Sequence, residues 1–205
     1  MSTMEPSPQA ASALRARNLR TIAALAALFL LPIAASFWLY YGLGWSPGKH
    51  VNHGELLEPA RPLPSVSLPA ADGTGPVANL FVKRWALVYV GDGRCDSACR
   101  YTLFVMRQTR LDLGNDMPRV ARVFLATTAC CNEALLAREY AGLIVLDASG
   151  SSGQRLLQAF PGGDRRSMIF IVDPLGNLMM RYDSRRDPNG LLEDLQRLLR
   201  LSHIG

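Results

Sequence analysis

The sequence predicts an α/β fold, a mixed sheet with helices on both faces, preceded by one N-terminal transmembrane helix. Residues 21–43 form an apolar run without a charged residue. From about residue 66 onward, apolar runs of strand length alternate with amphipathic stretches of helix length, a pattern typical of α/β proteins. The last two runs of strand length flank the turn sequence Pro174-Leu175-Gly176-Asn177, which indicates an antiparallel hairpin at the end of the sheet.

The composition permits a folded core and argues against a nucleic-acid partner. The chain has 205 residues, of which 49% are apolar and 19% charged, so it can form one ordinary domain with an appendage. Arg15, Arg17 and Arg20 precede the apolar run, and Glu5 is the only acidic residue before it. Subtracting these four from the totals of 22 basic and 17 acidic residues leaves 19 basic and 16 acidic residues in the rest of the chain, an excess of positive charge. This excess is too small to predict a nucleic-acid-binding surface.

The apolar run has the length of a membrane span. Its 23 residues would extend roughly 34 Å as a helix, against a hydrocarbon core of about 30 Å. Transmembrane helices tolerate an internal proline such as Pro32, and aromatic side chains gather at the far end, as at a membrane interface: Trp38, Tyr40, Tyr41 and Trp45. A cleaved signal peptide is the alternative, but its apolar core would be unusually long and no small-x-small cleavage site follows. An uncleaved anchor is therefore predicted.

The charges around this span predict its orientation. Because the arginines precede it and mixed charges follow it, the N-terminus is expected in the cytoplasm and residues from about 46 onward outside. In a bacterium the protein would lie in the inner membrane with its C-terminal domain in the periplasm, where thiols are oxidised. Residues 1–20 are expected to be a disordered cytoplasmic tail, 44–65 a proline-rich linker and 66–205 the folded domain.

The elements of the domain are predicted from local patterns in chain order. Two short apolar pieces around Asp72-Gly73 indicate a hairpin within residues 65–80. Continuous apolar runs predict buried strands, whereas apolar positions three or four residues apart predict helices. The first helix takes Asp96 or Ser97 as its N-cap. The expected strands are 85–90, 119–127, 143–147 and two within 168–182, and the expected helices are 97–113, 132–141, 152–160 and 189–200.

Two cysteines, Cys95 and Cys99, lie between the first central strand and the first long helix. In α/β sheets, functional groups gather where strands end and helices begin. A helix N-terminus stabilises a thiolate, the form that attacks disulfides and binds soft metals. Sulfurs at positions i and i+4 could form a disulfide, bind Cu(I) in near-linear geometry, or be two small buried apolar groups. An oxidising compartment and polar neighbours at Asp92, Arg94 and Asp96 favour a functional pair.

Several segments together resemble the Sco/SenC family. They are the anchor, the proline-rich linker, the segment "LPAADGTGPVANLFVKRWALVYVGDGRCDSAC" and the later "SMIFIVDPLGN". The resemblance covers roughly residues 64–200, and its most specific parts are the Cys-x-x-x-Cys after a strand and the Asp-Pro-x-Gly hairpin. It implies a thioredoxin-like fold and a role in building the copper centre of cytochrome c oxidase. It also implies that Cys95 and Cys99 bind copper together with a distant histidine, or reduce a partner's disulfide as a dithiol.

The sequence departs from this family at the histidine. The expected place, about nine residues before the hairpin proline, points to Arg165. An arginine there would repel a metal cation, but it would favour a nearby thiolate in redox chemistry. His50, His53 and His203 lie in the predicted linker and at the C-terminus, where we expect exposed surface residues. Three residues between the cysteines, and Ser167 near the place of a cis-proline, also distinguish the chain from ordinary thioredoxin-type oxidoreductases.

A second pair, Cys130 and Cys131, follows the strand predicted at 119–127. If this strand is a parallel neighbour of 85–90, both cysteine pairs lie at the same carboxyl edge of the sheet. The second pair could then exchange disulfides with the first in a relay. Two other interpretations are a four-thiol metal site, which adjacent cysteines fit poorly, and a pair in which one cysteine is buried and the other has no role.

The function predicted from the sequence is that of a membrane-anchored Sco/SenC-like protein in cytochrome c oxidase biogenesis. It would act as a thiol–disulfide oxidoreductase through Cys95 and Cys99 on an oxidase subunit or assembly factor, with Arg165, Cys130 and Cys131 as accessory residues. One alternative is a Cu(I) chaperone that holds copper at Cys95 and Cys99. Another is a non-catalytic accessory protein that binds the oxidase or an assembly factor through the surface of the same site.

Overall fold

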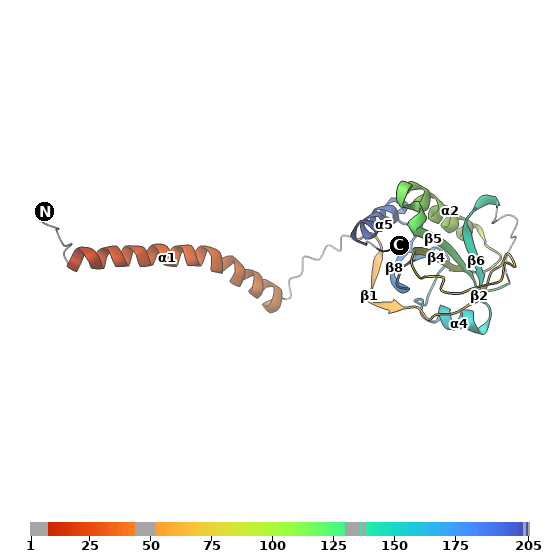
Figure 1. Cartoon of the computed structure of the whole chain (residues 1–205), viewed down its shortest axis with the longest axis horizontal. Helices are drawn as coiled ribbons and strands as arrows, with labels where there is room; N and C mark the ends of the chain where they lie inside the picture. Colours follow the sequence, from red (N-terminus) through yellow and green to blue (C-terminus); the bar gives the residue numbers. More distant parts are fainter. Residues whose placement is uncertain (1–7, 44–51, 130–135, 137, 203, 205) are drawn as a thin grey trace. The chain divides into compact units, whose positions relative to one another are not determined.

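The computed structural model of the chain describes residues 8–43, 52–129, 136, 138–202 and 204. It contains two compact units, an N-terminal helical unit within Met1–His50 and a domain within Val51–Gly205 (Figure 1). The domain carries all of the sequence features that predict chemistry.

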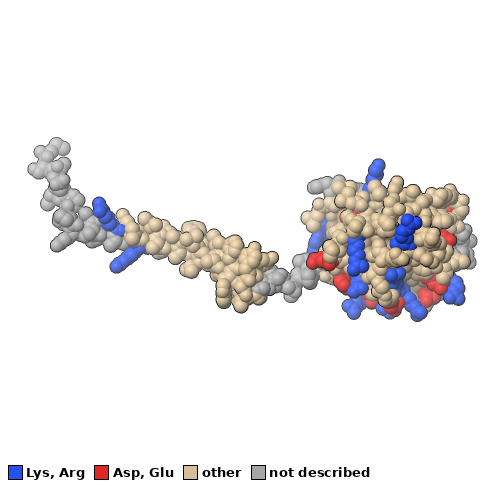
Figure 2. Space-filling model, turned by 90° about the horizontal axis from the view of Figure 1, so that it is seen from below, with Lys and Arg blue, Asp and Glu red and all other residues tan. Residues whose placement is uncertain are grey.

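The N-terminal unit is a long helix, α1 (Pro8–Phe37), which continues into a π-helical turn, η1 (Trp38–Gly42). By length and composition, Arg17–Gly42 is a candidate membrane span, with a mean hydropathy of 2.3, and its surface shows no charge beyond the arginines at its start (Figure 2). Ser36 Oγ donates a hydrogen bond to the carbonyl of Pro32 inside this helix. The expected disordered tail at 1–20 is wrong for residues 8–20, which are helical because alanine, leucine and arginine there favour helix.

The domain is built on a six-stranded mixed sheet with the strand order β1-β8-β7-β4-β5-β6. The strands β4, β5 and β6 run parallel, whereas β7 is antiparallel to β4, and β8 and β1 continue the antiparallel half. The bounds are β1 (Glu55–Pro62), β4 (Trp85–Gly91), β5 (Val120–Ala126), β6 (Leu143–Asp147), β7 (Met168–Val172) and β8 (Asn177–Asp183). A separate hairpin pairs β2 (Leu68–Pro69) with β3 (Pro76–Val77).

Helices cover both faces of the sheet, as the sequence predicts. The helices α2 (Ser97–Asp112) and α5 (Pro188–Leu201) pack on one face, and the short α4 (Ser151–Leu157) packs on the other (Figure 1). Alternate side chains of β4 enter the two halves of the core, Leu87 and Tyr89 on the α2 side and Val88 and Val90 on the α4 side. A 3₁₀ helix, η2 (Gly114–Arg119), connects α2 to β5.

The folded domain begins earlier than the sequence predicts. The linker expected at 44–65 is wrong from residue 55 onward, because Glu55–Pro62 forms β1 at the edge of the sheet. Pro59 and Pro62 did not predict a strand, but an edge strand tolerates residues that lack an N–H. The other strands agree with the predicted ones, whereas the helix predicted at 132–141 falls largely outside the described residues.

Candidate active site

The loop between β4 and α2 places the first cysteine pair at the carboxyl end of a central strand. Asp96 is the N-cap of α2, since its Oδ1 accepts a hydrogen bond from the N–H of Cys99 at 2.9 Å. Cys95 has a φ of 46°, a left-handed conformation that favours glycine. Its N–H donates to the carbonyl of Asp92 at 3.1 Å. The loop therefore turns tightly just before the helix begins.

A second loop, directly after β5, holds this turn in place. Asp92 Oδ1 accepts hydrogen bonds from the N–H of Arg94 at 2.8 Å and from Thr128 Oγ1 at 3.0 Å. Thr128 Oγ1 in turn accepts from the N–H of Gly93 at 3.0 Å. A Cβ at Gly93 would lie 2.5 Å from the carbonyl oxygen of Ala129, so only glycine permits this approach. Hydrogen bonds from the Arg94 side chain, then from its backbone, lower the pKa of Asp92 to about 2.

Cys95 and Cys99 form a disulfide, with their Cα atoms 5.1 Å apart. The two sulfur-bearing residues differ in exposure, because Cys99 is 2% exposed whereas Cys95 is half-buried. Cys99 packs into the core beneath α2 and Cys95 packs at the margin of that core. A partner molecule can therefore reach Cys95 far more easily than Cys99.

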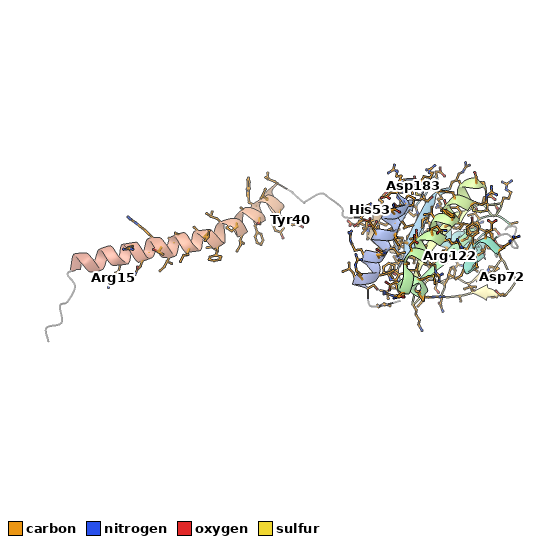
Figure 3. All side chains as sticks on the ribbon, turned by 90° about the horizontal axis from the view of Figure 1, so that it is seen from above. Arg15, Tyr40, His53, Asp72, Arg122 and Asp183 are labelled. Carbon is orange, nitrogen blue, oxygen red and sulfur yellow. A yellow bond between two sulfur atoms is a disulfide. The ribbon has the colours of Figure 1, made fainter. Side chains whose placement is uncertain are left out.

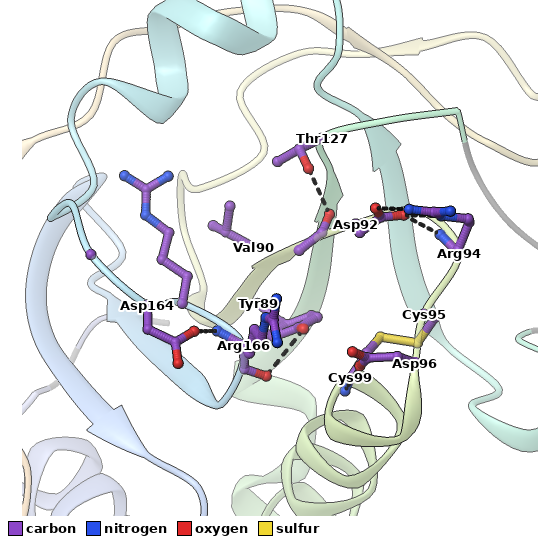
Figure 4. A pocket seen from close by; sticks show the side chains of 13 residues that line it. Tyr89, Val90, Asp92, Arg94, Cys95, Asp96, Cys99, Thr127, Asp164 and Arg166 are labelled. Atoms are coloured by element: carbon purple, nitrogen blue, oxygen red, sulfur yellow. Dashed lines mark hydrogen bonds and ion pairs between the residues drawn. A yellow bond between two sulfur atoms is a disulfide. The ribbon is translucent and has the colours of Figure 1, made fainter.

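The disulfide borders a hollow of about 490 Å³. Figure 4 shows the disulfide on one side of it and Asp164 and Arg166 on the other. The hollow lies at the carboxyl ends of the parallel strands β4 and β5 and beside the segment that leads into the antiparallel strand β7. Its lining residues are Tyr89, Val90, Gly91, Asp92, Arg94, Cys95, Asp96, Cys99, Thr127, Gly163, Asp164, Arg165 and Arg166.

A buried polar network joins the two sides of the hollow. The carbonyl of Arg166 accepts hydrogen bonds from Tyr89 Oη at 3.2 Å and from Thr102 Oγ1 at 3.4 Å. The Thr102 hydroxyl, one helical turn below the disulfide, also shares a hydrogen bond with Ser184 Oγ at 3.1 Å. Burial, then the charges of Asp96 and Asp164, raise the pKa of Tyr89 to about 12. Tyr89 thus remains a neutral hydrogen-bond donor at physiological pH.

Arg165 lines the hollow, but its guanidinium is bound to its own loop. Nε donates to the carbonyl of Pro161 at 2.8 Å and Nη2 donates to that of Phe160 at 3.0 Å. Burial lowers the pKa of the Arg165 side chain. In this arrangement the Arg165 side chain stabilises the segment that precedes β7.

The described histidine is away from the disulfide. His53 contacts Asp187 Oδ2 through Nδ1 at 3.0 Å and Glu193 Oε2 through Nε2 at 3.1 Å, beside α5 (Figure 3). It does not line the hollow at Cys95 and Cys99. No group of three or more histidine, cysteine or acidic side chains suited to a metal occurs within the described part of the chain. His50 and His203 lie outside it.

The second cysteine pair, Cys130 and Cys131, also falls outside the described residues. The segment that leads to it is described as far as Ala129 and touches Gly93. Sequence reasoning missed the far side of the hollow, formed by Tyr89, Asp164 and Arg166. Only Tyr89 carried a usable signal, since a tyrosine near the end of an otherwise apolar strand presents a hydroxyl at the sheet edge.

A family model described as "transmembrane-like, thioredoxin-like, C-terminal domain" matches residues 85–202, which is more than half of the chain. This protein belongs to that family. The matched region contains the disulfide, the hollow and five of the six strands of the main sheet. A comparison with curated protein sequences finds no significant match.

Solved Sco structures share the fold of this family member. It is similar to apo Sco1 from Thermus thermophilus, with a TM-score of 0.58 and 19% identity over 74% of this chain and 99% of that one. Copper-bound yeast Sco1 gives a TM-score of 0.59 and 11% identity, over 68% of this chain and 93% of that one. BsSco, described for its disulfide switch, gives a TM-score of 0.54 and 13% identity, over 75% and 100%. The thioredoxin-like, Sco-type fold implied by the sequence resemblance is thereby confirmed.

Proposed function

We propose that this protein is a membrane-anchored thiol–disulfide exchange protein in the assembly of a respiratory cytochrome oxidase. The observation that carries the proposal is the disulfide between a half-buried Cys95 and a buried Cys99 at the start of α2. Support for the biological setting comes from the Sco-type fold, since BsSco is described as a member of the Sco family of cytochrome c oxidase assembly proteins. The partner would be an oxidase subunit or an assembly factor on the periplasmic side.

In the proposed exchange, the reduced pair transfers two electrons to a partner's disulfide. The Cys95 thiolate attacks one partner sulfur, so that a Cys95–partner disulfide forms and the partner's own disulfide breaks. The thiolate of Cys99 then attacks Cys95 Sγ, which releases the partner sulfur that was bound to Cys95 and forms the Cys95–Cys99 bond. The two thiol protons end on the partner's sulfurs. A separate dithiol reductant must restore the reduced pair.

The surroundings of the pair suit this chemistry. The N-terminus of α2 favours a thiolate on the residues of its first turn, and Cys99 occupies that turn. The exposed Asp96 carboxylate opposes this effect, but it also fixes the turn by accepting from the Cys99 N–H. The hollow beside Cys95 leaves room for the residues that flank a partner cysteine.

A Cu(I) chaperone is the second candidate, because solved Sco structures contain bound copper. When reduced, Cys95 and Cys99 would offer two soft thiolates to Cu(I) as a transported substrate. Among the described residues, the side chains that line the hollow include no histidine, and its three arginines, Arg94, Arg165 and Arg166, are matched by three aspartates. Without a histidine ligand, the two thiolates alone would have to hold the ion. We therefore place disulfide exchange first.

Two measurements on the full-length chain in detergent test whether disulfide exchange or copper transfer is the function. Equilibration in thiol–disulfide buffers should give a Cys95–Cys99 pair that is readily reduced and reoxidised, and Cys95→Ser should abolish the transition. Titration with Cu(I) under reducing conditions should detect no tight one-to-one complex that depends on Cys95, as judged by comparison with Cys95→Ser. Tight one-to-one binding would instead favour the chaperone. Full complementation of oxidase assembly by Cys95→Ser/Cys99→Ser would favour a non-catalytic accessory protein.

The relay between the two cysteine pairs remains part of the proposal. It is supported by the contact of Gly93, in the first loop, with Ala129, the residue before Cys130. Mass spectrometry of non-reduced peptides should then find Cys95 or Cys99 linked to Cys130 or Cys131 at intermediate redox potentials. Absence of such a linkage under every redox condition would remove Cys130 and Cys131 from the mechanism.

A further inference from the structure

The outer face of α2 carries an apolar stripe that is close to half exposed in the described structure. Tyr101 is 44% exposed, Phe104 is 49% exposed and Leu111 is 46% exposed. Their spacing of three and seven residues places them on one side of the helix. The apolar residues on the opposite side, such as Leu103 and Met106, are fully buried against the sheet. We call Tyr101, Phe104 and Leu111 the outer stripe of α2.

This stripe begins at the disulfide. Cys99 lies in the first turn of α2, and a helix rises about 1.5 Å per residue, so Tyr101 and Phe104 lie only about 3 and 8 Å further along the axis. Cys95 precedes the same helix and is the accessible residue of the pair. A polypeptide whose cysteine reaches Cys95 must therefore place some of its neighbouring residues over the beginning of α2.

The stripe is flanked by positive charge. Arg100 and Arg107 are two helical turns apart, and within the described residues neither forms an ion pair with a carboxylate. Their field reaches nearby groups, since both act to lower the pKa of Tyr140 against the larger effect of burial. The closest carboxylates along the helix, Asp96 and Asp112, lie at its two ends.

We propose that the outer stripe of α2 is the docking surface for the redox partner, and that the docked segment is a cysteine-containing polypeptide rich in apolar and acidic residues. The apolar side chains would cover Tyr101 and Phe104, and the carboxylates would meet Arg100 and Arg107. This inference rests on the proposed disulfide exchange and adds to it the chemistry that selects the partner. Aromatic and arginine side chains are the types that contribute most at protein interfaces.

The test uses peptides whose single cysteine carries a 2-nitro-5-thiobenzoate group as a mixed disulfide. Attack by Cys95 on the peptide sulfur releases the coloured thiolate, and Cys99 then releases the peptide thiol. Three peptides are compared, one with leucine and glutamate around the cysteine, one with leucine and lysine, and one with serine and glutamate. The protein is the reduced full-length chain in detergent, with Cys130→Ser/Cys131→Ser so that one pair reacts.

The leucine–glutamate peptide should react fastest at low salt, and its advantage over the leucine–lysine peptide should shrink as salt screens the charges. Tyr101→Gln/Phe104→Gln should lower its rate by about tenfold, because loss of an aromatic anchor commonly costs this much affinity. Arg100→Gln/Arg107→Gln should remove the preference for glutamate over lysine. Glutamine is a good helix former, so unchanged melting temperatures check that α2 is intact.

Matched controls lie elsewhere on the domain. Leu175 is 70% exposed in the turn between β7 and β8, so Leu175→Gln removes an exposed apolar side chain away from α2. Arg155, on α4, provides the charge control as Arg155→Gln. Neither substitution should change the rates. Equal rates for all three peptides, or equal effects of the control variants, would overturn the docking surface.

The free reagent 5,5′-dithiobis(2-nitrobenzoate) separates this inference from the proposed function. If it reacts normally while the peptides show no selectivity, exchange chemistry stands and the docking surface is wrong. If the reduced chain does not react with the reagent, both proposals fail together. A dimer of the full chain that Tyr101→Gln/Phe104→Gln dissociates, with peptide rates unchanged, would assign the stripe to a second copy and would also overturn the proposal.

Discussion

Cys95 adopts a backbone conformation that an L-residue rarely takes, and its neighbours explain why it persists. Its φ of 46° lies in the left-handed region, and such residues cost energy and cluster at functional sites. The Asp92 carbonyl accepts from the Cys95 N–H, and the Asp92 carboxylate accepts from both Arg94 and Thr128. The position of the accessible cysteine is therefore determined by a carboxylate three residues before it and by a hydroxyl from the loop after β5.

Tyr89 makes the free energy of unfolding of the domain fall at alkaline pH. Its pKa is raised from 10.0 to about 12, chiefly by burial. Between these values the unfolded chain releases a phenol proton that the folded chain retains, so the free energy of unfolding falls as the pH rises from about 10 to about 12. Tyr89→Phe should make this fall shallower by close to one proton, measured by urea unfolding at several pH values.

The control for this prediction is Tyr182, whose pKa is also raised to about 12, first by burial. Tyr182→Phe should reduce the same slope without changing the rate of disulfide exchange, since Tyr182 does not line the hollow at the disulfide. An unchanged slope in Tyr89→Phe would show that the phenol of Tyr89 ionises equally well in the folded and unfolded chain.

Among the elements, β1 depends most on a contact from the far end of the chain. The carboxylate of Asp194 in α5 is 3% exposed, and its Oδ2 accepts hydrogen bonds from the N–H groups of His53 and Gly54, both at 2.8 Å. Arg181 of β8 also forms an ion pair with Glu55 of β1 at 2.7 Å. The strand is thus attached at its start by α5 and along its length by β8.

Asp194→Ala should detach the beginning of β1. Two N–H groups would lose a charged acceptor in a largely buried place, which we expect to lower the free energy of unfolding by about 3 kcal/mol. Hydrogen exchange should accelerate in residues 53–62 while β4 and β5 remain protected. The matched control is Glu193→Ala, which removes an exposed carboxylate that contacts the His53 ring. Uniform acceleration across the sheet would contradict this local role.

The elements that sequence patterns predicted are those whose signal is local. The apolar run 85–90 predicted β4, and the cap at Asp96 predicted the start of α2, so the cysteine pair could be placed between them. Both signals act within a few residues. β1 was missed because its sequence is rich in proline and its partner Asp194 lies about 140 residues away. For the same reason, the side of the hollow formed by Asp164 and Arg166 could not be placed beside Cys95 without the fold.

For Arg165, the resemblance to the Sco/SenC family predicted its place but not its contacts. Alignment with the hairpin proline put it near the cysteines, and it does line the hollow. The carbonyls that accept its hydrogen bonds, those of Phe160 and Pro161, depend on how one irregular loop folds back on itself. No periodic pattern encodes such a contact.

The whole chain combines a candidate membrane span with a thioredoxin-like domain. We expect the full-length protein, produced in a bacterial host, to stay with the membranes after an alkaline carbonate wash, and its domain to be digested by protease added from the periplasmic side. Leu28→Arg, in the middle of the span, should weaken insertion by about 3 kcal/mol. Leu201→Arg, at a side chain of the domain that is 76% exposed, should leave it unchanged. Protection from the added protease would reverse the predicted orientation.

The early start of the folded domain also restricts where the disulfide can act. Ten residues, 43–52, separate the end of η1 at Gly42 from the contact of His53 with Asp194, and covalent geometry limits ten residues to about 36 Å. With the helix in a membrane, a tether of this length would keep the thioredoxin-like domain close to the bilayer instead of in the whole compartment. Within that layer a membrane-bound cysteine meets Cys95 at a high effective concentration, whereas a freely diffusing thiol gains nothing from the short tether.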